Sequence, residues 1–237
     1  MKTVRHILRW ICIGFICSTV LAVVAYRFIP VYVTPLMLIR SVGMLTDSEQ
    51  EFRWHHSWVS LSDMSVHMPV AIMAGEDSHF LSHHGFDFNA IQKAREHNQH
   101  SKKIYGASTI SQQTAKNVFL WPGNTNLQKW IRKGFEAYFT VLIEMMWSKQ
   151  RIMEVYLNSI EMGDGIYGLQ AVAEDNFGKN ASELTRDECA LIAATIPNPH
   201  IYDSKNPSRY VRKRQKRLLN EMRYIGTFPR EGEDLRK

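Results

Sequence analysis

Carboxylates and histidines gather in one short segment that directly follows an apolar stretch. Residues 76–85 read EDSHFLSHHG. A carboxylate at the end of a buried helix, beside a turn, can have its pKa raised and then act as a general base or acid. A solvated helix end contains the same residue types, and this simpler interpretation is favoured while the segment is taken alone.

Histidine spacing in this segment also suits a metal ion. His79 and His83 would lie one helical turn apart, with His84 adjacent to them. A closed metal site needs further ligands, and the sequence has no second cluster of cysteine, histidine and carboxylate to supply them. The sequence therefore predicts no metal-ligating residues.

A second segment combines hydroxyl groups, amides and a cation. Residues 106–117 read GASTISQQTAKN. Hydroxyls at a helix start are often N-caps. Paired amides followed one turn later by a lysine also suit sugar hydroxyls and phosphate, so both interpretations stay open.

The elements that must position these residues are predicted to be mostly helices, because runs of alternating β-branched residues are few. Pro69 breaks or starts the first helix. The third is predicted to be the central helix, with one apolar face formed by Ile131, Phe135, Tyr138, Leu142 and Met146 at helical spacing. A fourth helix is predicted to begin near residue 149. A capping box of Thr185 and Glu188 precedes a fifth helix, which Pro197 ends. The predicted helices cover residues 64–76, 108–120, 127–147, 189–194 and, with many basic residues, 206–226. That last helix is predicted to be a solvated or membrane-facing surface.

The start of the chain carries an uncharged apolar run at residues 10–26, flanked by Lys2, Arg5 and Arg9 before it and by Arg27 after it. It approaches the length that crosses a bilayer. We predict a cytoplasmic basic segment 1–9, a transmembrane helix 10–27, a membrane-proximal connector 28–48 and one exported domain 49–237, since basic residues stay inside. A cleaved signal peptide is the alternative, because Val23 and Ala25 are small enough for processing.

Charge and cysteine content limit the kinds of partner and of cross-link that the protein can have. The net charge is +6 and the pI about 9.2, which favours anionic partners: nucleic acid, lipid headgroups or a phosphorylated substrate. Cys12 and Cys17 fall within the predicted span, so Cys189 is the one cysteine outside it. An internal disulfide is excluded there, and Cys189 is predicted to fill the core.

The two segments resemble motifs of the peptidoglycan glycosyltransferases (glycosyltransferase family 51), E-D-x-x-F-x-x-H-x-G and G-x-S-T-I-x-Q-Q-x-x-K-N, at every fixed position. Residues 132–136, RKGFE, resemble the family's R-K-x-x-E, and residues 149–158 resemble its K-x-x-I-L-E-x-Y-L-N. Several multi-residue motifs in the same order over about residues 50–225 make chance agreement improbable. His79 departs from the Arg common before Phe80, and Gly75 and Met153 depart from Ser and Leu.

This resemblance implies a mostly α, lysozyme-like transglycosylase domain that polymerises lipid II, a disaccharide-pentapeptide on a polyprenyl pyrophosphate. Glu76 would be the general base on the acceptor 4-hydroxyl, and Glu136 would support the site or the leaving group. A divalent cation, Mg²⁺ or Mn²⁺, would assist at the pyrophosphate in some members. The residues implied to hold substrate and pyrophosphate are Lys116, Arg132, Lys133, Lys149, Ser108, Thr109, Gln112, Gln113 and Asn117.

Relatives of this family often add a penicillin-binding transpeptidase domain, which needs Ser-x-x-Lys and Lys-Thr-Gly motifs. Neither motif occurs here, so the chain resembles the monofunctional, biosynthetic members. That resemblance implies an inner membrane location with a periplasmic catalytic domain. Its partners would be lipid II, the nascent glycan, membrane lipids and cell-division or elongation proteins, and not nucleic acid. A lysozyme-like hydrolase and a non-catalytic scaffold are the alternatives.

Overall fold

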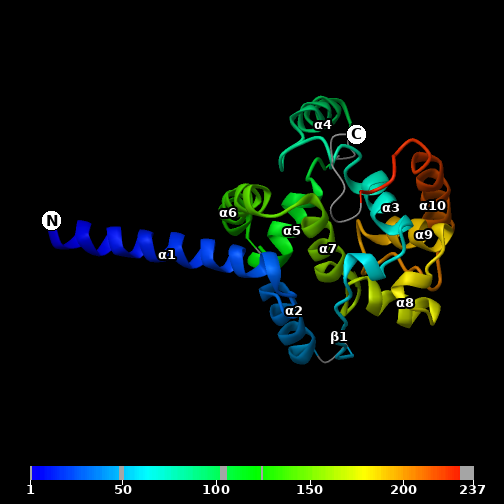
Figure 1. Ribbon diagram of the computed structural model, residues 1–237, viewed down its shortest axis with the longest axis horizontal. Coiled ribbons are helices and arrows are strands. Elements are labelled where there is room, and N and C mark those ends of the chain that lie inside the picture. Colours follow the sequence, from blue (N-terminus) through cyan, green and yellow to red (C-terminus); the bar gives the residue numbers. More distant parts are fainter. Residues whose placement is uncertain (1, 48–50, 102–105, 124, 230–237) are drawn as a thin grey trace.

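A long helix projects from one end of a helical domain. The computed structural model describes residues 2–47, 51–101, 106–123 and 125–229. Helix α1 (Lys2–Phe28) extends away from the other elements, and α10 (Arg209–Glu221) lies at the opposite end of the molecule (Figure 1). The molecule is therefore a domain with an appendage, as the distribution of apolar residues predicts.

Helices dominate the domain, which confirms the predicted mostly α class. A small sheet has strand order β1-β3-β2, with β1 parallel to β3 and β2 antiparallel to it. The other elements are α2 (Pro35–Thr46), α3 (His67–Glu76), α4 (Phe88–His100), α5 (Ile110–Phe119), α6 (Asn126–Met146), α7 (Lys149–Ser159), α8 (Leu169–Phe177), α9 (Arg186–Thr195), β1 (His55–His56), β2 (Glu161–Gly163), β3 (Ile166–Tyr167) and 3-10 turns at Leu61–Asp63 and Ala181–Glu183.

Helix α3 presents the carboxylate segment at its end. Met68, Ala71 and Ile72 are fully buried, and α3 packs against α9 and α10. Pro69 lies in the first turn, where a missing N–H costs nothing, so it starts the helix instead of breaking it. The helix ends at Glu76, which leaves that side chain at the edge of the core.

Helices α5 and α6 both begin with a capping box, formed by Thr109 with Gln112 and by Thr125 with Gln128. Each box satisfies two backbone N–H groups that have no partner inside the helix. The start of α5 is therefore Ile110, two residues after the predicted one, because Thr109 is its cap. The α7 and α9 helices start as predicted, at Lys149 and behind the Thr185 cap.

The predicted apolar face of α6 packs against the core through Phe135, Tyr138, Leu142 and Met146. The buried side chains of α6 are Glu136, Phe139, Thr140 and Ile143. Part of the predicted face also contacts α1, since the ring centroids of Phe135 and Tyr138 lie 5.8 and 5.9 Å from that of Phe15; Ile131 is exposed. The predicted apolar face is therefore confirmed at four of its five positions, and α1 covers part of it.

Helix α1 is long and apolar enough to serve as a single-pass membrane anchor. Of its side chains, Val23 alone is buried among the described residues. It begins at Lys2, eight positions before the predicted span, because the basic residues continue the helix. Its last turns contact the domain: Trp147 Nε1 donates to the Val23 carbonyl at 2.8 Å, and Arg151 Nη2 donates to the Tyr26 carbonyl at 2.8 Å. These two bonds hold the last turns of α1 against the domain.

The C-terminal helix is shorter than the predicted 206–226. Ser208 caps it, and the helix runs Arg209–Glu221 because the Ser208 hydroxyl accepts the Val211 N–H. Val211 and Leu218 are fully buried against α9 and α3. Cys189 on α9 is also fully buried, and burial raises the pKa of its thiol to about 12, which confirms the predicted core role.

Candidate active site

Glu76 ends α3 with its carboxylate partly shielded from solvent. Gln113 Nε2 on α5 donates to Glu76 Oε2 at 2.9 Å, and the Tyr156 hydroxyl on α7 donates to Gln113 Oε1 at 3.3 Å. Burial raises the pKa of Glu76, while the Gln113 hydrogen bond and the charges of Arg214 and Lys116 lower it by less. A carboxylate of raised pKa is suited to accept a proton near neutral pH.

Arg214 is a site residue that sequence reasoning missed. Its Nη2 atom on α10 lies 3.8 Å from Glu76 Oε1, and its buried Nε atom has no hydrogen-bond partner among the described residues. The available signal was spacing: Arg214 follows buried Val211 by three positions and precedes buried Leu218 by four, so it shares their face of the helix.

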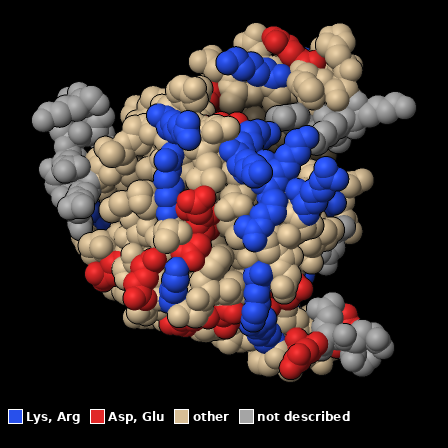
Figure 2. Space-filling model, turned by 90° about the vertical axis from the view of Figure 1, so that its right-hand side faces the viewer, with Lys and Arg blue, Asp and Glu red and all other residues tan. Residues whose placement is uncertain are grey.

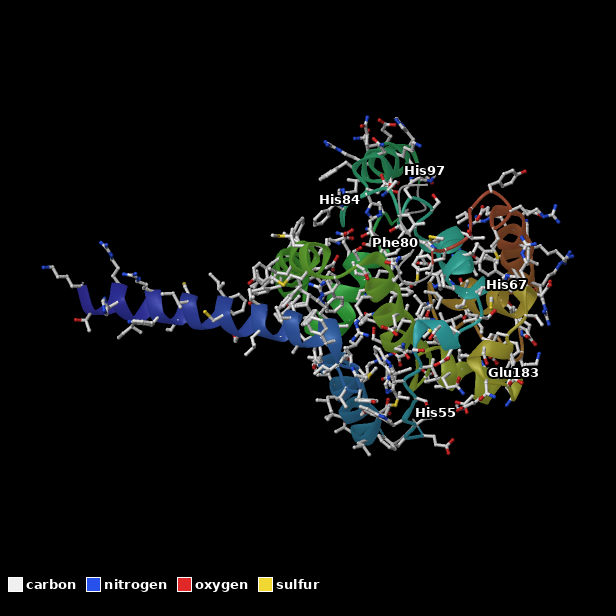
Figure 3. All side chains as sticks on the ribbon, in the orientation of Figure 1. His55, His67, Phe80, His84, His97 and Glu183 are labelled. Atoms are coloured by element: carbon white, nitrogen blue, oxygen red, sulfur yellow. The ribbon has the colours of Figure 1, made fainter. Side chains whose placement is uncertain are left out.

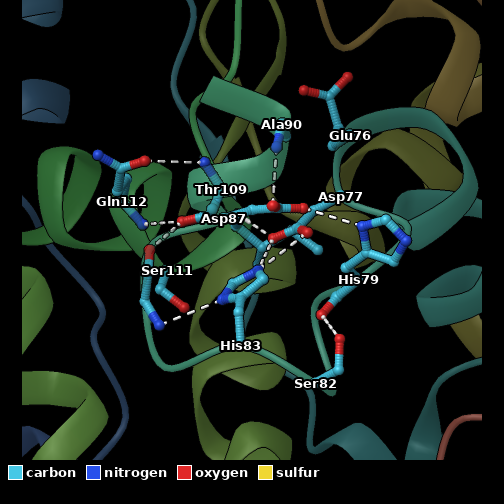
Figure 4. A network of polar contacts seen from close by, with 12 residues as sticks. Glu76, Asp77, His79, Ser82, His83, Asp87, Ala90, Thr109, Ser111 and Gln112 are labelled. Atoms are coloured by element: carbon cyan, nitrogen blue, oxygen red, sulfur yellow. Dashed lines mark hydrogen bonds and ion pairs between the residues drawn. The ribbon is translucent and has the colours of Figure 1, made fainter. Parts of the chain in front are cut away.

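Behind Glu76, Asp77 organises the segment that follows α3 (Figure 4). Its carboxylate contacts His83 Nε2 at 2.9 Å and accepts the Ile110 N–H at 3.1 Å. His79 Nδ1 contacts Asp87 Oδ2 at 2.9 Å, and the other oxygen of Asp87 caps α4. The histidines at metal-ligand spacing thus bind two different carboxylates.

Side chains of this segment alternate between interior and surface. Phe80 is fully buried inside the domain, whereas His84 is exposed (Figure 3). Thr109 Oγ1 donates to the Gly85 carbonyl at 2.6 Å, which ties the end of the segment to the start of α5. The segment is therefore held from both sides, which fixes the direction in which Glu76 leaves α3.

Lys116 of α5 lies within electrostatic reach of Arg132, Lys133 and Glu136 of α6. Lys133 Nζ binds Glu136 Oε1 at 2.5 Å and donates to the Ser108 hydroxyl at 3.4 Å. Burial lowers the pKa of Lys116, and the charges of Glu136 and Glu76 raise it by less, so Lys116 lies within electrostatic reach of both carboxylates. Arg132 and Lys133 also act on Lys116, and the Arg132 Nε atom is buried without a partner among the described residues. An unpaired buried donor in a cluster of cations suits an anionic ligand.

Four of the predicted ligands also make contacts that support the fold. Thr109 and Gln112 form the capping box, and Asn117 is buried within α5. Lys149 Nζ binds Glu144 Oε1 at 2.7 Å and lies 4.5 Å from the Phe80 ring centroid. Burial lowers the pKa of Lys149, offset in part by Glu144. Substrate binding by these four residues stays a prediction.

A cavity of about 500 Å³ opens in front of Glu76. Its wall includes Ser78, His79, Ser108 and Thr109, along with Lys93 and His97 of α4. The volume is in the range of small-molecule sites. Carboxylate, hydroxyls and cations therefore converge on one open space.

Among the described residues, one set of side chains has the spacing of metal ligands, and it belongs to other elements. Ligand atoms of Glu161, Asp164 and His200 lie within 4.8 Å of one another. Arg40 Nε of α2 binds Glu161 Oε2 at 3.3 Å and also contacts His200. A guanidinium already supplies positive charge there, so the cluster is an ion-pair network that ties α2 to the domain.

Glu76 is a carboxylate of raised pKa at the wall of a cavity and lies within electrostatic reach of Lys116 and Arg214. This arrangement suits an enzyme that uses a general base. The chain belongs to the Transglycosylase family, whose sequence profile matches residues 44–223. It is a peptidoglycan glycosyltransferase.

Three proteins called biosynthetic peptidoglycan transglycosylase illustrate the similarity. The one from Bacteroides thetaiotaomicron is 55% identical, covering 97% of this chain and 90% of that protein. The Caulobacter vibrioides protein is 48% identical, covering 92% of this chain and 90% of that protein. One from Xanthomonas campestris pv. campestris is 44% identical, covering 95% of this chain and 91% of that protein. Similarity thus includes the anchor as well as the catalytic domain.

Proposed function

We propose that the chain extends peptidoglycan by adding lipid II units to a strand linked to polyprenyl pyrophosphate, with Glu76 as general base. One observation carries the proposal: Glu76 lines an open cavity, and Lys116 lies within electrostatic reach of both Glu76 and Glu136. Membership of the Transglycosylase family supports the reaction class.

The chemical step would use these groups in two ways. The ionised Glu76 takes the proton of the acceptor 4-hydroxyl while that oxygen forms a bond to the anomeric carbon of the donor. The bond from this carbon to the pyrophosphate oxygen breaks, and the leaving group keeps the electron pair. A pyrophosphate leaves readily, so catalysis needs mainly an active base and cations that neutralise the developing charge.

Lys116, Arg132 and Lys133 would hold the pyrophosphate. The Arg132 Nε atom supports this role because it is a buried donor without a described partner. Glu136 would fix Lys133 through the ion pair at 2.5 Å and keep its amino group directed toward the cavity side of Ser108. Ser108 and Gln113 would contact the sugars, the latter while orienting Glu76.

A divalent cation would need the substrate itself as a ligand. Glu136 raises the pKa of Lys116 more than Glu76 does. One carboxylate together with pyrophosphate oxygens suits Mg²⁺ or Mn²⁺. When bound, such an ion would add positive charge at the leaving group. The residues of this chain supply the same charge through their own ammonium and guanidinium groups.

We place the domain on the periplasmic side of the inner membrane, with the N-terminus in the cytoplasm. Lys2, Arg5 and Arg9 precede the uncharged part of α1, and basic residues stay inside. Lipid II and the growing strand are the proposed substrates there. Cell-division or elongation proteins are the proposed partners.

The test uses the full chain in detergent with labelled lipid II, with and without divalent metal, and separates products by electrophoresis. Long glycan ladders are expected. Absence of polymer where a known polymerase makes it would contradict the proposal and favour a scaffold. Shortening of pre-made glycan would contradict it in favour of a hydrolase.

A further inference from the structure

Helix α10 carries a dense row of cations at the end of the molecule opposite α1. Figure 2 views that end, and the Lys and Arg side chains gather over α10 there. The α10 sequence has six basic residues and one acidic residue. Those exposed on α10 and just after it are Arg209, Arg212, Lys213, Lys216, Arg217 and Arg223.

Most of this charge has no counter-charge among the described residues. Arg217 binds Glu221 at 3.2 Å, and Arg214 turns inward to Glu76. Lys213 and Lys216 form no ion pair within the described chain. Cations crowded on one helix repel one another, so an anion bound across them relieves repulsion and adds attraction.

The basic row adjoins a groove that leads from the site. A cavity of about 710 Å³ is lined by Arg217, Glu221 and Tyr224 and also by Ser78 and His79. Ser78 and His79 line the cavity of Glu76 as well. The two cavities are therefore neighbours that share the wall formed by Ser78 and His79, so an extended ligand held at Glu76 would lie next to the C-terminal end of α10.

The position of this face argues against a membrane as its partner. The face is turned away from α1, so a bilayer that holds the anchor lies at the other end of the molecule (Figures 1 and 2). The pyrophosphate is assigned to cations of α5 and α6, which are separate from this row. The remaining anion near the groove is the polymer itself, since its stem peptides carry free carboxylates.

We propose that the basic face of α10 binds the carboxylates of the stem peptides on the nascent glycan and keeps the strand attached between additions. This inference rests on the proposed function. It assigns no chemistry to Lys213 or Lys216. Their contribution would be electrostatic retention of a polyanionic glycopeptide, which added salt weakens.

The test compares the full chain with the double variant K213Q/K216Q and with the control R95Q/K205Q, which removes two exposed cations elsewhere. Affinity is measured for purified uncrosslinked glycan with intact peptides and for the same glycan with its peptides removed. We expect K213Q/K216Q to bind peptide-bearing glycan about five-fold more weakly, as two exposed ion pairs imply. Its affinity for bare glycan, and the control's affinity for both, should be unchanged.

Two results would overturn the inference. One is an unchanged affinity of K213Q/K216Q for peptide-bearing glycan. The other is a loss of binding to vesicles of anionic phospholipid without any loss for glycan, which would make this face a membrane surface. Failure of the proposed function is separate, because a wild type that binds peptide-bearing glycan but makes no polymer would retain this inference and lose the polymerase assignment.

Discussion

The surroundings of Glu76 balance two opposing effects on one carboxylate. Burial raises its pKa, and Gln113, Arg214 and Lys116 oppose that rise by less. A general base must be ionised before it can accept a proton. The rate is therefore expected to rise with pH through the pKa of Glu76, and Arg214 helps to keep that pKa low enough for use.

Replacing Arg214 with Gln tests this balance. Removing the positive charge 3.8 Å from Glu76 Oε1 disfavours the ionised carboxylate and raises its pKa. The acid limb of kcat/KM should move to higher pH, with a several-fold loss below the wild-type midpoint and little loss on the alkaline plateau. The measurement is the pH profile of lipid II polymerisation.

Arg95→Gln is the matched control, because Arg95 is an exposed arginine of α4 that lies outside the basic face of α10. Its profile should coincide with that of the wild type. If Arg214→Gln lowered the rate equally at every pH, the arginine would have a structural role and no effect on the base.

At the scale of the element, Gly85 ends the segment that follows α3 in a conformation that side chains rarely adopt. Its φ is +91°, and a Cβ atom there would lie 2.8 Å from Thr140 Cγ2. Gly85→Ala should lower the free energy of unfolding by about 2–4 kcal/mol, from backbone strain and overpacking. Thermal unfolding in detergent measures it.

Gly134→Ala provides the opposite case on α6, where a Cβ atom would meet nothing within 4 Å. Alanine in a helix interior should stabilise the protein by about 0.5–1 kcal/mol. Equal effects of the two substitutions would show that Gly85 is not required by its backbone conformation.

The helices were predictable from local signals, but their neighbours were not. Capping residues such as Thr185 act on the next turn and can be read from the sequence. The apolar face of α6 was predicted from periodicity, but periodicity does not show that α1 covers part of that face. Arg214 was missed for a related reason, since a basic helix gives no sign of which cation turns inward.

At the scale of the whole molecule, the docking of α1 onto α6 and α7 fixes how the site stands above a membrane. Arg151 and Trp147 bind carbonyl oxygens at the end of α1, so anchor and domain are joined without a free hinge at those bonds. The predicted orientation puts the domain outside the cytoplasm. A lipid-linked substrate would then approach the site from the same bilayer that holds the anchor.

That orientation is testable by fusing β-lactamase to the C-terminus of the full chain. Cells should become resistant to ampicillin, since the reporter acts only when exported. Fusion at the N-terminus, before the basic residues, should leave them sensitive. Resistance from the N-terminal fusion alone would contradict the orientation.

The sequence motifs located Glu76, Lys116, Arg132, Lys133 and Glu136, which the fold places in one region. Motifs do not distinguish ligands from supports, however. Lys149 belongs to the same pattern but is buried against Glu144 and Phe80. Exposure depends on which helices pack together, and a single sequence carries that information only indirectly.

Loss of fold can be separated from loss of the base at Glu76. Because burial raises the pKa of Glu76, ionising this side chain lowers the free energy of unfolding. The loss of stability begins as the pH rises above the pKa of Glu76 in the unfolded chain, and it is complete above the pKa in the folded protein. Glu76→Gln should therefore melt no lower than the wild type at pH 8. A lower melting temperature would contradict the raised pKa.

The most direct test of the account is the rate of lipid II polymerisation by Glu76→Gln, with Glu96→Gln, an exposed carboxylate on α4, as control. A lost general base should lower the rate by about 100-fold or more, and the control should match the wild type. A Glu76→Gln rate within about ten-fold of the wild type would show that this carboxylate is not the base.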